Sequence, residues 1–124
     1  MEKQTYSYEE AFAKSLEYFN GDELAARVWV NKYAVKDSFG NIYEQSPEDM
    51  HWRLANEVAR IEAKYKNGLS AQQLFELFDH FKYIVPQGSP MTGIGNDFQV
   101  ASLSNCFVIG IDGTADSYGA IIRI

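Results

Sequence analysis

The residue with the clearest chemical potential is Cys106, the only cysteine of the chain. It follows "SLSN", in which three of the four residues are small and polar, and precedes the apolar run "FVIGI". A thiol there could act as a nucleophile or reductant if it is accessible and its pKa is suitable. One cysteine cannot form an internal disulfide, so a redox role requires a second thiol from outside these 124 residues. The alternative is a buried structural cysteine, since free cysteines are often core residues.

Two other short segments combine hydroxyl or carboxylate groups with turn residues. In "PQGSPMTG", prolines and glycines constrain a polar loop in which Ser89 could donate to a ligand oxygen. A turn with a capping serine explains the same pattern. In "DSYG", Asp116 could accept a hydrogen bond from a sugar hydroxyl, although ordinary turn chemistry also explains it.

Common motifs of metal and nucleotide sites are absent from the sequence. It contains no CxxC, HExxH or GxxxxGK[ST] motif, and we expect no metal site. "GIGNDF" lacks the third glycine of a dinucleotide fingerprint. His51 and His80 are far apart in sequence, and we expect both to be ordinary, partly exposed side chains.

The composition predicts a soluble chain that forms one domain or part of one. Hydrophobic residues make up 46% of it, and its net charge of −6 argues against a nucleic-acid polymer or an anionic membrane as partner. No apolar run approaches the ~20 residues of a membrane span. The start "MEKQTYSYEE" lacks the features of a signal peptide. Together with the single cysteine, these features predict a cytoplasmic location.

Helices are predicted for the first two thirds of the chain, and they must position the segments named above. A turn is predicted at "DSFGN", residues 37–41, and the helix after it should be the longest, ending at "NG", residues 67–68. Capping residues predict four helix starts. These are Ser7 with Glu10, Asp22, Ser46 with Pro47 and Asp49, and Ser70 with Gln73.

The pattern changes after residue 82. "VPQGSPMTGIGNDFQ" is too rich in glycine and proline for a continuous helix, and "CFVIGI" predicts a short buried strand. "DGTADSYG" predicts a loop, and "AIIRI" resumes an apolar pattern. The predicted fold class is therefore α+β. A helical region over residues 1–82 would be followed, over residues 83–124, by the first loop and strand elements of a larger domain.

Several segments taken together resemble the large, catalytic subunit of ribonucleotide reductases. "FKYIVPQGSPMTGIGN", "SLSNCFVIG" and "DSYGAI" occur in the order and spacing of that family. Upstream, "VWVNKYAVKD" and "GNIYEQSPEDMHWRLANEVARIE" resemble the N-terminal helical region of its adenosylcobalamin-dependent class II branch. The resemblance covers nearly the whole chain and is most specific over residues 81–119.

The resemblance implies a fold and an activity. Family members reduce ribonucleotides to deoxyribonucleotides within a ten-stranded α/β barrel, where a thiyl radical on a central cysteine abstracts the 3′ hydrogen of the substrate ribose. Two further cysteines supply electrons and become a disulfide. Residues 83–124 would be the truncated start of that barrel.

The resemblance also implies roles for individual residues. Cys106 is similar to the first cysteine of the reducing pair. Ser89 matches the hydroxyl residue that contacts substrate phosphate or ribose, and Ser104 and Asn105 match the substrate-lining pair before the cysteine. The start of the specificity-site loop, where a deoxynucleoside triphosphate effector binds, is matched by Asp116, Ser117 and Tyr118.

The radical cysteine, the second reducing cysteine and the catalytic Glu and Asn of the family have no match in this chain. The resemblance thus implies a partial or split ribonucleoside-diphosphate reductase, inactive without the C-terminal remainder of the catalytic chain. That remainder would bind the cofactor, adenosylcobalamin. Further implied partners are the ribonucleotide substrate, the allosteric effector, a thioredoxin-like reductant and a second copy in a homo-oligomer. The alternative is a non-catalytic helical interaction module or an inactive remnant of the same family.

Overall fold

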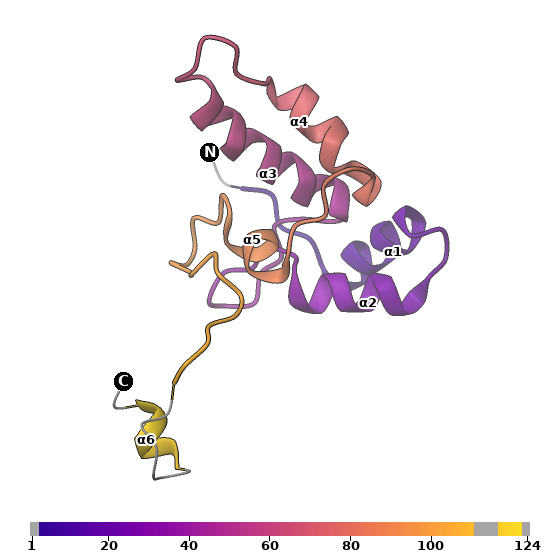
Figure 1. Cartoon of the computed structure of the whole chain (residues 1–124). Coiled ribbons are helices and arrows are strands. Elements are labelled where there is room, and N and C mark those ends of the chain that lie inside the picture. Colours follow the sequence, from indigo (N-terminus) through magenta and orange to yellow (C-terminus); the bar gives the residue numbers. More distant parts are fainter. Residues whose placement is uncertain (1–2, 111–116, 123–124) are drawn as a thin grey trace.

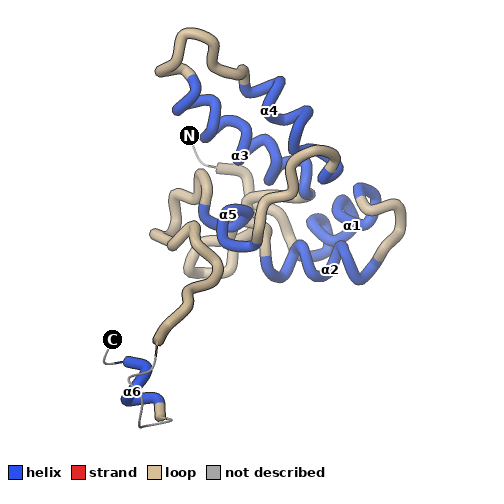
Figure 2. Tube along the Cα trace, in the orientation of Figure 1, coloured by secondary structure: helices blue, strands red, loops and turns tan. Residues whose placement is uncertain are grey.

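The computed structural model describes residues 3–110 and 117–122, and within these residues it is helical (Figure 1). Figure 2 shows helices joined by loops, with no strand in the described part of the chain. The elements are α1 (Tyr8–Tyr18), α2 (Glu23–Lys32), α3 (Pro47–Glu62), α4 (Ala71–Phe78), the 3₁₀ turn η1 (Asp79–Phe81), α5 (Gly88–Gly93) and α6 (Tyr118–Ile122).

Side-chain caps explain where three of these helices begin. The Ser7 hydroxyl accepts from the N–H of Glu10 at 3.2 Å, and the Glu10 carboxylate accepts from the N–H of Ser7 at 2.8 Å. This reciprocal pair is a capping box, and Ser70 and Gln73 form the same arrangement at the start of α4. Asp22 caps α2 with its carboxylate. The predicted starts of α1, α2 and α4 are therefore confirmed.

The start of α3 lies where the sequence predicts, but its cap is different. Ser46 is the N-cap residue and Pro47 the first helical residue, yet the Ser46 side chain makes no capping bond. Asp49 accepts instead from the N–H of Gln45 at 3.0 Å, one residue further out. The predicted capping box at Ser46 is therefore wrong, although Asp49 still satisfies an amide at the entrance to the helix.

The helix α3 also ends earlier than predicted, at Glu62 rather than at residues 67–68. A Cβ added at Gly68 would lie 2.1 Å from the Glu62 carbonyl oxygen, so the chain turns back on itself at a distance that only glycine allows. The Glu62 carboxylate then accepts from the N–H of Leu69 at 2.9 Å. This close return replaces the last predicted turn of the helix.

Two helical pairs form the body of the protein, α1 with α2 and α3 with α4. Trp29 on α2 donates its indole N–H to the sulfur of Met50 on α3 at 3.3 Å, which joins the two pairs. Burying a large apolar side chain contributes about 1.5–3 kcal/mol, so the side chains around this contact hold the pairs together. The buried core comprises Ala11, Trp29, Val30, Ala34, Ile42, Met50, Leu54, Ala55, Leu74 and Phe78.

The part after residue 82 differs most from the prediction. The glycine- and proline-rich segment contains the short helix α5, which the sequence pattern did not predict. The expected strand at "CFVIGI" is not formed over residues 106–110, which are exposed loop, and residue 111 lies outside the described residues. A strand needs a neighbour to pair its N–H and C=O groups, and the described residues contain no named strand beside it. The described fold is thus all-helical rather than α+β.

We expect Ser7→Ala and Ser70→Ala each to lower the free energy of unfolding by about 1 kcal/mol, because each removes a cap that satisfies a helix N–H. Ser46→Ala is the matched control. It should lower the free energy of unfolding by less than either of the other variants, since the Ser46 hydroxyl makes no capping bond. Urea unfolding followed by circular dichroism measures all three variants. Equal losses in the three would contradict the capping assignments.

Candidate functional site

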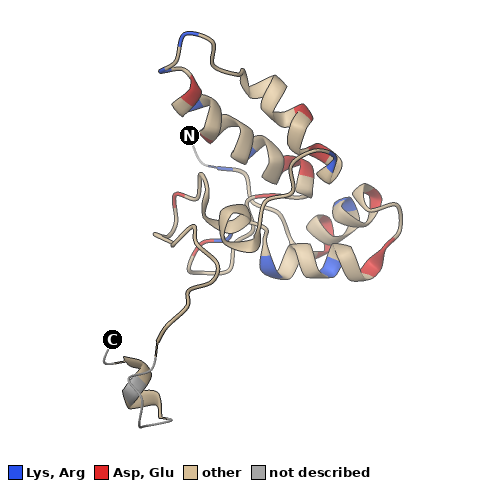
Figure 3. Cartoon of the chain, viewed as in Figure 1, with Lys and Arg blue, Asp and Glu red and all other residues tan. Residues whose placement is uncertain are grey.

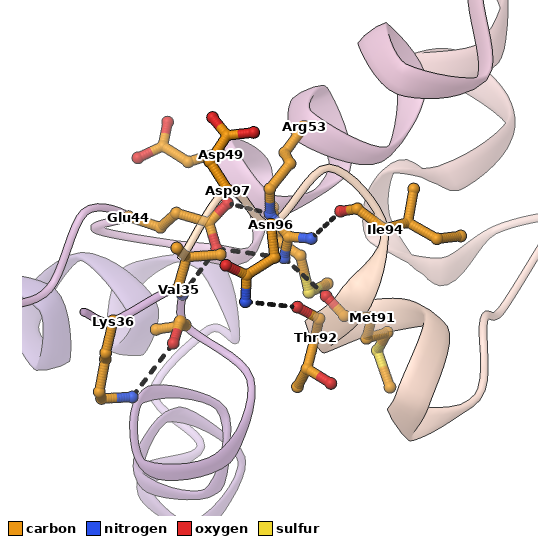
Figure 4. Close-up of polar contacts among 12 residues, drawn as sticks. Val35, Lys36, Glu44, Asp49, Arg53, Met91, Thr92, Ile94, Asn96 and Asp97 are labelled. Carbon is orange, nitrogen blue, oxygen red and sulfur yellow. Dashed lines mark hydrogen bonds and ion pairs between the residues drawn. The ribbon is translucent and has the colours of Figure 1, made fainter. Parts of the chain in front are cut away.

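A largely buried guanidinium attaches α5 to the helical body (Figure 4). Arg53 extends from α3, its side chain is 12% exposed, and its Nε and Nη2 lie 3.0 and 3.3 Å from the carboxylate of Glu44. Nη2 also donates to the carbonyl of Met91 at 2.6 Å, and Nη1 donates to the carbonyl of Ile94. Carbonyls at the end of a helix lack intrahelical hydrogen-bond donors. At the end of α5, the N–H groups of Arg53 act as these donors.

Glu44 connects this group to the segment between α2 and α3. Its side chain is 7% exposed, and it accepts from the N–H of Val35 at 3.0 Å. We call Arg53, Glu44, Val35, Met91 and Ile94 the Arg53 cluster.

Lys36, the neighbour of Val35, donates to the carbonyls of Val30 and Ala34 near the end of α2. Burial lowers the pKa of Lys36 because it disfavours the ammonium ion, and the charge of Glu44 opposes that effect. The end of α2, the segment between α2 and α3, the second turn of α3 and the end of α5 therefore meet at this group of residues.

The structure brings together two of the predicted substrate residues, Ser89 and Asn105. The side-chain oxygen of Asn105 accepts from the N–H of Ser89 at 3.0 Å, and its amide nitrogen donates to the side-chain oxygen of Gln87. At the other end of α5, a Cβ added to Gly93 would lie 2.8 Å from Leu103. The segment that carries Cys106 thus runs back along α5.

Cys106 and Ser104 are both exposed. The N–H of Ser104 donates to the hydroxyl of Ser102 at 3.3 Å. Because the thiol of Cys106 is not part of the core, the alternative of a buried structural cysteine is wrong for this structure. The redox role of Cys106 stays a prediction.

A second polar cluster lies around His51, which the sequence predicted to be partly exposed. That prediction is wrong, because His51 is fully buried. Its Nδ1 lies 3.3 Å from the carboxylate of Asp79 and 3.4 Å from the hydroxyl of Tyr18, which itself donates to Asp79 at 2.9 Å. The spacing of α3 contains the signal, since His51 precedes the buried Leu54 by three positions and so shares its face.

The His51 cluster, formed by His51, Asp79, Tyr18 and His80, supports an unusual turn of the backbone. His80 and Phe81 both have a φ of 55°, a conformation that costs energy for residues other than glycine. The Tyr18 hydroxyl accepts from the N–H of His80 at 2.6 Å, and the two rings stack with their centroids 4.6 Å apart. The His80 side chain is 68% exposed, as predicted. These contacts direct the chain from α4 toward α5.

Burial and hydrogen bonding to Asp79 shift the pKa values of two members of the His51 cluster, His51 and Tyr18. Burial lowers the pKa of His51, while its hydrogen bond to Asp79 acts in the opposite direction. Burial and the hydrogen bond to Asp79 both raise the pKa of Tyr18. A carboxylate only accepts, so Nδ1 of His51 carries the proton. Nε2 is then an acceptor, and it is the buried side-chain atom that lacks a hydrogen-bond partner among the described residues.

Most of the helical region matches one known protein family. Residues 19–93 match the family described as "Ribonucleotide reductase, all-alpha domain". This chain belongs to the ribonucleotide reductase family. No curated protein and no solved structure matches it.

The family match includes α2 to α5, and so it contains Ser89, all of the Arg53 cluster except Ile94, and all of the His51 cluster except Tyr18. All the other predicted site residues of this ribonucleotide reductase chain lie after the matched region, namely Ser104, Asn105, Cys106, Asp116, Ser117 and Tyr118.

Two of the three predicted effector residues, Ser117 and Tyr118, lie in the described part of the chain, at the start of α6. Ser117 precedes α6, and its carbonyl accepts from the N–H of Ile121 at 3.3 Å. Tyr118 is the first residue of α6 and is exposed. Asp116 lies outside the described residues. The effector role of these three residues stays a prediction.

Adenosylcobalamin does not fit the residues of this ribonucleotide reductase chain that the structure describes. The unpaired Nε2 of His51 belongs to a ring flanked by Phe78 and Phe81, whose centroids lie 6.4 and 4.8 Å away, which leaves no access for a large cofactor. Within the described ranges no group of three His, Cys, Asp or Glu side chains could hold a metal ion.

No helix in the described part of the chain is long and apolar enough to cross a membrane.

We expect the free energy of unfolding to decrease as the pH falls below about 6.5, the ordinary pKa of histidine. Below that pH the unfolded chain protonates His51 more readily than the folded chain does, because burial lowers the folded pKa. The loss should continue until the pH reaches the folded pKa, with a slope of at most about 1.4 kcal/mol per pH unit for one proton. Urea unfolding between pH values of about 5 and 8 measures it.

His51→Gln should reduce this slope, because glutamine does not titrate. His80→Gln is the comparison variant, since the His80 ring is 68% exposed and its charge is only a minor cause of the lowered pKa of His51, so it should reduce the slope by less than His51→Gln does. The same slope in His51→Gln and in the wild type would show that His51 is not the titrating group.

Proposed function

We propose that the chain is the N-terminal part of a ribonucleotide reductase catalytic chain, in which Cys106 is one of the two thiols that reduce the substrate. One observation carries the proposal. Asn105, the neighbour of Cys106, bonds to the N–H of Ser89 at 3.0 Å in the first turn of α5, within the region that matches the family. Two residues assigned to the substrate thus meet next to an exposed thiol.

The chemistry needs two electrons and two protons. Reduction of a ribonucleotide releases one ribose hydroxyl oxygen as water, and two thiols that supply the electrons become a disulfide. Cys106 would be one of them, and the second would come from outside these residues. A thioredoxin-like dithiol would restore the pair by thiol–disulfide exchange, which requires access to a sulfur atom. The exposure of Cys106 suits this requirement.

The contacts of α5 suggest how Ser89 would serve the substrate. Its N–H is already engaged by Asn105, so we assign the Ser89 hydroxyl, rather than the amide, to the phosphate or ribose. Ser104 and Asn105 would line the same site from the segment before the thiol. The substrate would be a ribonucleoside diphosphate.

The remaining assignments rest on the class II resemblance. Adenosylcobalamin would bind the polypeptide that completes the enzyme, and a deoxynucleoside triphosphate effector would bind Asp116, Ser117 and Tyr118. A cytoplasmic location is part of the same proposal.

An open apolar groove favours a second candidate function, a helical interaction module without catalysis. The groove measures about 340 Å³, and its walls include Leu24 and Val28 of α2 and Phe81 of η1. Leu24 and Val28 are exposed although they are apolar. Larger exposed apolar areas mark interaction sites on many proteins.

A mixing experiment separates the two functions. The chain is combined with the C-terminal portion of a class II enzyme, adenosylcobalamin, a dithiol reductant and a ribonucleoside diphosphate, and deoxyribonucleotide is measured. We expect turnover with the wild type and none above background with Cys106→Ser, because serine cannot form the disulfide. Ser38→Ala, at an exposed position of the turn between α2 and α3, is the control and should remain active. Full activity of Cys106→Ser would contradict the proposed role of the thiol.

The proposed homo-oligomer has its own test. Residues 98–110 contain no charged side chain, as Figure 3 shows, and Phe107 and Val108 are exposed there. We expect sedimentation analysis to show concentration-dependent association that Phe107→Asp together with Val108→Asp weakens at least about tenfold, because charge opposes apolar burial. Phe39→Asp, at an exposed turn, should leave the association unchanged. A wild-type chain that is monomeric at every concentration would contradict self-association.

A further inference from the structure

The helix α5 cannot maintain its own position. It has six residues, begins and ends with glycine, contains Pro90, and has no buried residue. Isolated helices of this length are unstable in water, and glycine and proline lower helix stability further. Its position must therefore come from contacts with the rest of the protein.

Arg53 supplies the strongest of these contacts. Its guanidinium donates to the carbonyls of Met91 and Ile94, at the end of α5, while Glu44 fixes its other edge at 3.0 Å. Gly95 passes close to the stem of the same side chain. A Cβ at Gly95 would lie 2.9 Å from Cγ of Arg53, and its φ of 71° favours glycine as well. The residues directly after α5 therefore lie against the Arg53 side chain.

Only an arginine has the donors for this arrangement. Its planar guanidinium offers five N–H groups in fixed directions, whereas a lysine offers one compact ammonium group. Here the donors reach one carboxylate before α3 and two backbone carbonyls at the end of α5. A lysine at this position could donate to fewer of these three acceptors at the same time.

We propose that Arg53 is a positioning residue for the substrate site. It touches none of the residues assigned to the substrate. It fixes the end of α5, the first turn of α5 presents Ser89, and the N–H of Ser89 binds Asn105 next to Cys106. The assignment of this geometry to a substrate rests on the proposed function above, whereas the mechanical connection from Arg53 to Asn105 does not.

Amide hydrogen exchange of the isolated chain, measured by NMR, tests the connection. Asn105→Ala removes the acceptor of the Ser89 N–H and defines the exchange rate of an unprotected Ser89 amide. We expect Arg53→Lys to raise the Ser89 rate toward that limit, by at least about tenfold, because α5 then opens locally. The N–H of Ala26, bonded to Asp22 at 3.1 Å in α2, should exchange at its wild-type rate.

Arg60→Gln is the matched control. Arg60 lies on the same helix, its side chain is 62% exposed, and it pairs with Glu57 one turn away. Arg60→Gln should change the exchange rate of neither the Ser89 amide nor the Ala26 amide. If Arg53→Lys does not fold, Glu44→Gln replaces it, since this variant keeps the arginine but weakens its fixed edge, and it should raise the Ser89 rate by a smaller factor.

Two outcomes would overturn the proposal. An unchanged Ser89 rate would show that Arg53 does not position α5. Equal increases at Ser89 and Ala26 would show that it contributes only to global stability. In the mixed enzyme, Arg53→Lys should raise KM for the ribonucleotide more than it lowers kcat. The exchange result does not depend on turnover, so it stands or fails separately from the role of Cys106.

Discussion

The ion pair between Arg53 and Glu44 is the constraint on which the site region depends. Both side chains are largely buried, and removing charges from water costs several kcal/mol per ion unless hydrogen bonds compensate. The compensation here comes from the backbone, through the N–H of Val35 and the carbonyls of Met91 and Ile94. The pair is therefore satisfied only when three chain segments are in place, and this makes it a device for fixing α5 rather than a source of general stability.

The helix α3 carries two polar clusters with different purposes. His51 and Arg53 are two positions apart and so point to different sides of the helix. The His51 cluster fixes the turn after α4, where His80 and Phe81 have unfavourable backbone angles, and the Arg53 cluster fixes α5. The chain between α4 and α5 is thus held at both ends by side chains of one helix. The core contact of Trp29 with Met50 then connects α3 to the first helical pair.

The helical part was predictable where its structure depends on residues close together in sequence. It was not predictable where the structure depends on contacts between residues far apart in sequence. The caps at Ser7 and Ser70 involve residues three positions apart, so the sequence reveals them directly. The burial of His51 depends on Asp79 and Tyr18, which are distant in sequence, and only its place on the face of Leu54 indicated it. The short helix α5 depends on Arg53 and could not be predicted from its own glycines and proline.

The same distinction applies to the candidate site. Ser89, Asn105 and Cys106 came from a family resemblance, and the sequence did not show that Asn105 would bond to α5. Two segments carry the candidate site, namely α5 with Ser89 and the later segment with Asn105 and Cys106. Their hydrogen bonds to the rest of the protein differ in strength. Hydrogen bonds to charged groups contribute about 1.5–3 kcal/mol and ordinary ones about 1 kcal/mol. Arg53 makes charged bonds in a largely buried place, whereas the bonds of Asn105 are exposed and neutral. Ser89 therefore lies on the more firmly attached segment, and in the proposed enzyme the segment with Cys106 would be the one that exchanges its contacts when a substrate or reductant binds.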